Sequence, residues 1–68
     1  MKEFAVNLKN ERKKAGMTQQ EFAEDLGISL DVYKKWEQLG RGSRLPRVEM
    51  QLKIADMLNV SLDELFGR

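Results

Sequence analysis

Five basic side chains lie close together in the middle of this 68-residue chain. They are Lys34, Lys35, Arg41, Arg44 and Arg47. Only Glu37 opposes them between residues 34 and 47, so this stretch carries a charge of +4, and the rest of the chain carries −3. A basic stretch on an otherwise acidic molecule orients that molecule toward a polyanion. A solvated loop explains the same charges equally well, so charge alone leaves both interpretations open.

The composition argues against enzymatic activity. A chain of this length forms a small core and leaves no room for an enzyme's cleft. It contains no histidine and no cysteine, which excludes an imidazole base, thiol chemistry and the usual zinc ligands. No serine lies beside a base in a catalytic motif, and no nucleotide-binding loop is present. We therefore expect no enzyme, no cofactor and no metal site.

The cellular setting is predicted from two further absences in the sequence. No stretch resembles a signal peptide or a membrane span, since apolar runs are only two or three residues long. The lack of cysteine fits a reducing compartment. These features predict a cytoplasmic protein in which residues 1–68 form a single domain.

Helical periodicity is the dominant secondary-structure signal, and no alternating strand pattern of useful length appears. The expected helices cover approximately residues 2–15, 18–26, 29–38, 46–58 and 61–66. Thr18 and Glu21 form a capping-box pattern at the second helix start, and the same pattern recurs at the fifth. The sequence therefore predicts an all-α fold with five helices.

The apolar positions of these helices predict the core. The expected inward residues are Phe4, Leu8, Phe22, Ala23, Leu26, Tyr33, Trp36, Val48, Leu52, Ala55 and Leu58. The two aromatic residues of the third helix are expected in the core and not as stacking platforms, because they lie three apart on its inner side. In the fifth helix, Leu62 and Phe66 are expected to remain free after the core has packed, as a surface for association.

A single glycine, Gly27, separates the second helix from the third. Because glycine adopts positive φ without a Cβ penalty, the third helix can leave the second at a steep angle. Ala23 lies four residues earlier, where a small side chain lets the two helices approach closely. This pattern predicts a helix-turn-helix, although an ordinary αα-corner would use the same glycine. The residues on the outward face of the third helix are what separates a DNA-binding helix-turn-helix from an ordinary αα-corner.

A family resemblance is carried by three segments, "ERKKAGMTQQEFAEDLGIS", "KKWE" and "LKIADMLNVSLDELF", with a proline before the last. The chain resembles the Cro and phage-repressor type helix-turn-helix domains, also called the XRE family. The resemblance covers residues 8–66 and implies a compact, lambda-repressor-like domain whose second and third helices form the helix-turn-helix. Family members commonly bind palindromic operators on double-stranded DNA as homodimers. The expected function is therefore a transcriptional regulator, in the first place a repressor. The alternative is a protein-binding module, such as an antitoxin that also binds its own operator.

The resemblance also assigns base-facing positions on the third helix, which would lie in the major groove. These positions are Leu30, Asp31, Lys34 and Lys35. Lysine can donate to guanine, aspartate can accept from cytosine, and leucine can pack on a thymine methyl group. Asp31 also lies in the first turn, where a carboxylate favours the helix dipole, so both roles stay open for this residue.

Two further groups are expected at the DNA backbone. Gln19 and Gln20, at the positive end of the second helix, are placed to hold a phosphate with their side chains and amides. The three arginines of the basic stretch, Arg41, Arg44 and Arg47, would reach the sugar-phosphate backbone or an adjacent minor groove.

Some charged and polar residues have structural roles by the same resemblance. Arg12 and Glu37 stand where similar domains pair the first helix with the end of the third, so we expect a partly buried ion pair there. Glu11 and Gln51 stand where family members often have apolar residues. We therefore expect the first and fourth helices to lose some core contacts.

Overall fold

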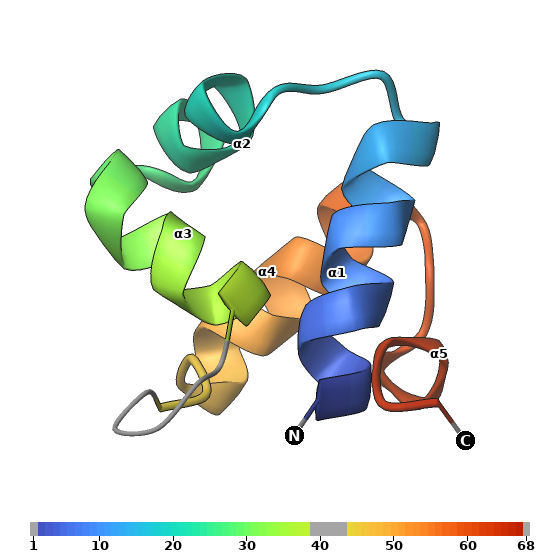
Figure 1. Ribbon diagram of the computed structural model, residues 1–68. Helices are drawn as coiled ribbons and strands as arrows, with labels where there is room; N and C mark the ends of the chain where they lie inside the picture. The colour runs from blue at the N-terminus through green and yellow to red at the C-terminus, as the bar shows by residue number, and fades with distance from the viewer. Residues whose placement is uncertain (1, 39–43, 68) are drawn as a thin grey trace.

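The computed structural model describes residues 2–38 and 44–67 (Figure 1). Its helices are α1 (Lys2–Lys14), α2 (Gln19–Leu26), α3 (Leu30–Gln38), α4 (Val48–Leu58) and α5 (Leu62–Leu65). Within these described ranges there is no strand. The all-α, five-helix fold is therefore confirmed, with helix bounds within two residues of those expected. Arg41 lies outside the described residues.

Side-chain caps define the start of two helices. Thr18 Oγ1 accepts a hydrogen bond from the Glu21 amide at 3.0 Å, and Glu21 Oε1 accepts one from the Thr18 amide at 2.9 Å. Ser61 and Glu64 form the same reciprocal pair at the start of α5. Each box satisfies backbone donors that a helix start leaves without an intrahelical partner. Both capping boxes predicted from the sequence are thus present.

The core lies where α1, α2, α3, α4 and α5 meet. Its buried members are Phe4, Leu8, Phe22, Ala23, Leu26, Tyr33, Ile54, Ala55 and Leu65. The rings of Phe22 and Tyr33 meet edge to face, with centroids 5.3 Å apart, a favoured geometry for aromatic pairs. Trp36 is half-buried and packs against this cluster, so both aromatic residues of α3 belong to the core region as expected.

The predicted inner face of α4 is wrong in two positions. Val48 is 59% exposed and Leu52 is 53% exposed, whereas Ile54 is fully buried. A helix turns by about 100° per residue, so Ile54 lies almost opposite Leu52 on the helix surface. Apolar residues surround most of α4, and its pattern therefore could not indicate which side would face the core.

The expectation for α5 is also wrong, because Leu62 and Phe66 both pack against the core. The rings of Phe66 and Phe4 lie 5.1 Å apart. Asn7 of α1 donates to the backbone oxygens of Glu64 and Leu65 at 3.2 and 3.1 Å. These contacts hold α5 beside the amino-terminal half of α1 (Figure 1), where its apolar side chains close the core.

The two polar departures from the family pattern each have a local partner. Gln51 Nε2 donates to the Pro46 carbonyl at 2.8 Å, which ties the body of α4 to its own entry. Glu11 accepts from Lys14 at 3.3 Å on the surface of α1. The part of the chain that the structure describes contains no helix with both the length and the apolar character of a membrane span.

Candidate nucleic-acid interface

The corner between α2 and α3 is formed by the turn at Gly27. This residue has φ +75°, and its amide donates to the Glu24 carbonyl at 3.0 Å. The next amide, of Ile28, donates to the Ala23 carbonyl at 3.1 Å. A Cβ built on Gly27 would meet no atom within 4 Å. Glycine is therefore favoured here by its left-handed backbone conformation and not by lack of space.

One side of α3 is committed to the core and the opposite side faces solvent. Tyr33 is fully buried, while Asp31, Lys34 and Lys35 are exposed and Leu30 is half-buried. Ser29 Oγ accepts from the Val32 amide at 3.2 Å, which caps the start of the helix. Among the described residues, neither lysine has a hydrogen-bond or ion-pair partner. Their ammonium groups are therefore available to an external acceptor.

The two glutamines at the start of α2 have different surroundings. Gln20 is exposed, and its Nε2 donates to Glu24 Oε2, one turn along the same helix, at 3.1 Å. Gln19 is half-buried, and its Nε2 donates to Glu37 Oε1 of α3 at 3.0 Å. The side chain expected to hold a phosphate is thus engaged inside the protein. The Thr18 cap takes the Glu21 amide. The amides of Gln19 and Gln20 have no acceptor within the described residues, as is usual for the first positions of a helix.

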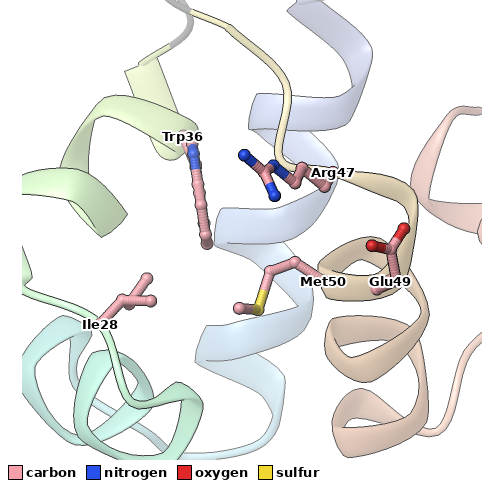
Figure 2. A pocket seen from close by; sticks show the side chains of 5 residues that line it. All are labelled: Ile28, Trp36, Arg47, Glu49 and Met50. Carbon is pink, nitrogen blue, oxygen red and sulfur yellow. The ribbon is translucent and has the colours of Figure 1, made fainter.

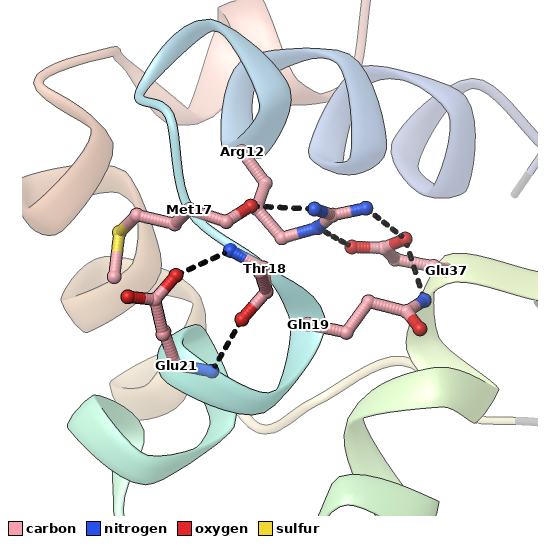
Figure 3. Close-up of polar contacts among 6 residues, drawn as sticks. All are labelled: Arg12, Met17, Thr18, Gln19, Glu21 and Glu37. Atoms are coloured by element: carbon pink, nitrogen blue, oxygen red, sulfur yellow. Dashed lines mark hydrogen bonds and ion pairs between the residues drawn. The ribbon is translucent and has the colours of Figure 1, made fainter.

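Arg12 and Glu37 form the ion pair that the resemblance implied (Figure 3). Arg12 Nε lies 2.6 Å from Glu37 Oε2, and Nη2 lies 3.2 Å from Oε1. The remaining terminal nitrogen of Arg12, Nη1, donates to the Met17 carbonyl at 2.6 Å. The two side chains are only 8% and 3% exposed. This network joins α1, the link before α2, and the end of α3.

The charge states of the network follow from these contacts. Burial alone would raise the pKa of the Glu37 carboxyl, but hydrogen bonds from Arg12 and Gln19, together with the nearby Tyr33 hydroxyl, outweigh it and lower that pKa. The hydrogen bond to Glu37 raises the pKa of Arg12. Tyr33 Oη lies beside the same carboxylate, although within the described part of the chain it has no hydrogen bond of good geometry. Burial, followed by this carboxylate, raises the pKa of the Tyr33 phenol.

Two described arginines, Arg44 and Arg47, lie near the entry to α4. Arg44 and Arg47 are both exposed, and Arg47 is the N-cap residue of α4 without a side-chain capping bond. Figure 2 shows the Arg47 side chain beside Trp36, at the edge of an apolar cavity of about 280 Å³. Ile28, Glu49 and Met50 complete its lining. No pattern in the sequence predicts this cavity, because its lining comes from three separated segments.

The comparisons with known proteins agree with this geometry. Residues 8–65 match the family model described as helix-turn-helix. The chain is 49% identical over 61 residues to the cryptic phage CTXphi transcriptional repressor RstR of Vibrio cholerae, covering 90% of this chain and 52% of that protein. It is 42% identical over 62 residues to YqaE, an uncharacterized HTH-type transcriptional regulator of Bacillus subtilis (91% and 51% covered). It is 41% identical over 61 residues to the HTH-type transcriptional regulator ImmR of the same organism (90% and 46% covered).

The chain spans about half the length of these three relatives. No solved structure matches it significantly. The family match runs from α1 into α5 and includes the whole α2–α3 corner. The chain therefore belongs to the XRE-type helix-turn-helix family of DNA-binding transcription regulators.

Proposed function

We propose that this domain binds double-stranded DNA by placing α3 in the major groove. The observation that carries the proposal is the division of α3 into two faces. Tyr33 anchors one face in the core, while Lys34 and Lys35 project from the other with no described partner. A helix presented in this way can enter the major groove, where lysine donates to guanine O6 and N7.

The remaining contacts divide into base-facing and backbone-facing groups. Asp31 and the partly exposed Leu30 lie in the first turn of α3, at the end that faces base edges in such domains. Gln20 and the open amides of α2 are suited to a phosphate, because the helix dipole also favours an anion there. Arg44 and Arg47 are exposed beyond α3 and suit the sugar-phosphate backbone. Arg41 remains part of the proposed backbone contact on sequence grounds alone.

The biological role that we propose is repression of transcription by residues 1–68 acting as one DNA-binding domain in the cytoplasm. The name of the Vibrio cholerae relative, a transcriptional repressor, supports this role. A single domain covers only a half-site, and one half-site seldom provides both affinity and specificity. We therefore propose a homodimer on a palindromic operator. The names of the relatives reported above describe regulators, and they lend no support to an antitoxin.

Selection of bound sites from a random DNA library tests the proposal most directly. The expected result is an enriched palindrome, bound more tightly than random duplex. Affinity for random duplex should fall steeply with added salt, because bound lysines and arginines release counterions from the DNA. The matched control is the double variant Lys34→Ala, Lys35→Ala, which should no longer enrich the palindrome from the library. A protein that enriches no sequence, and binds no duplex even at low salt, would refute the proposal.

A further inference from the structure

The two helices of the helix-turn-helix are joined at both ends. At the closed end, the Gly27 turn connects them through the backbone. At the open end, Gln19 is the first residue of α2 and Glu37 is the next-to-last residue of α3. Gln19 Nε2 donates to Glu37 Oε1 at 3.0 Å across 18 positions of the sequence (Figure 3). This side-chain bond is a cross-tie between the start of α2 and the end of α3.

The acceptor of this cross-tie is held in place from the other side. Arg12 binds both oxygens of the Glu37 carboxylate, and Arg12 also binds the carbonyl of Met17, the residue before the Thr18 cap. The carboxylate therefore offers a fixed position to which α2 is tied. Because Arg12 neutralises Glu37, the Gln19 amide is not needed to balance a charge, so it can be removed without leaving a buried charge unpaired.

We propose that Gln19 is a positioning residue, which holds the phosphate-facing start of α2 at a set distance from the base-facing surface of α3 through Glu37. The inference rests on the proposed DNA-binding function and extends it. The Gln19 amide nitrogen stays on Glu37 in the complex, and the phosphate beside α2 is held by backbone amides and by Gln20. A protein lacking the cross-tie samples several α2–α3 arrangements. Its apparent affinity then falls with the fraction that is competent to bind.

A double-mutant cycle separates positioning from direct contact. Gln19→Met keeps the length of the side chain and removes the donor, and it should weaken binding to the selected operator and to random duplex by about fivefold, the ratio typical of one net hydrogen bond. In an Arg12→Leu, Glu37→Leu background, which removes the acceptor and leaves no unpaired buried charge, the same substitution should change affinity by no more than about twofold. Asn7→Leu removes a similar amide bond between α1 and α5 and should leave DNA affinity unchanged.

Equal fivefold losses in both backgrounds would overturn the positioning role, because a direct phosphate contact does not depend on Glu37. A wild-type protein that binds no duplex would instead refute the proposed function, and this inference with it. Because the Arg12→Leu, Glu37→Leu background can impair folding, the side-chain amide of Gln19 is also followed by NMR in the wild-type protein. Its protons should exchange more slowly than those of exposed Gln20, both free and on DNA. Fast exchange in either state would overturn the proposal.

Discussion

Replacing Arg12 by leucine should reverse the way in which stability depends on pH. The substitution leaves the Glu37 carboxylate, only 3% exposed, without its cationic partner. Breaking a buried ion pair from one side costs about 3 to 5 kcal/mol, and the Met17 carbonyl also loses its donor. A domain of this size has a total stability of about 3 to 10 kcal/mol. The variant should therefore be close to unfolding at neutral pH.

The sign of the pH dependence follows from the pKa of Glu37. In the wild-type protein this pKa is lowered below its ordinary value, so the pair stabilises the fold above the unfolded-state pKa and stops doing so as pH falls through the folded-state pKa. In Arg12→Leu the loss of the cation lets burial dominate and raises the Glu37 pKa. The variant should then be most stable below the unfolded-state pKa and lose stability as pH rises through the raised value.

Urea unfolding followed by circular dichroism, repeated between about pH 2 and pH 7, measures this difference. The matched control is Arg12→Leu combined with Glu37→Leu. It removes both charges and should recover much of the lost stability, because paired apolar replacements avoid an unpaired buried charge. An Arg12→Leu protein that is as stable as wild type at neutral pH, or that loses stability on acidification as wild type does, would refute the reasoning.

Three further predictions concern DNA contact, the core and the turn. Lys35→Ala should cost about 1 to 3 kcal/mol on the preferred operator and relax one base preference, whereas Arg47→Ala should weaken all sequences alike and reduce the slope of log K against log salt by about one unit. Binding titrations on both kinds of duplex check this pair, and equal uniform losses would remove the recognition role from α3. Ile54→Ala should cost about 2 to 5 kcal/mol in urea unfolding, while exposed Leu52→Gln should stay within about 0.5 kcal/mol; similar losses would contradict the orientation of α4. Gly27→Ala should cost about 1 to 2 kcal/mol through its positive φ alone, and a thermal melt unchanged from wild type would argue against a left-handed turn.

The parts of the fold that were predicted correctly depend on short-range signals. The capping box of Thr18 and Glu21 involves residues three apart, and the turn at Gly27 depends on one backbone conformation. The family resemblance correctly implied the Arg12–Glu37 pair, because both residue types stand at matching positions. The proposed DNA contacts of α3 remain predictions, since they depend on a partner that is not part of the chain.

Local pattern, composition and family motifs determined that this protein is all-helical, where its helices begin and end, and which corner could meet DNA. These properties depend on residues within a turn or two of each other, so the linear order of residues contains them. Tertiary structure alone decided that α4 turns Ile54 inward and Leu52 outward, that Phe66 closes the core against Phe4, and that Gln19 is tied to Glu37. Each of these depends on how distant helices approach one another. A helix that is apolar on most sides, such as α4, is oriented only by the helices that pack against it. A side-chain amide such as that of Gln19, which could bond a phosphate or a protein group, is oriented only by the acceptor that the fold brings beside it.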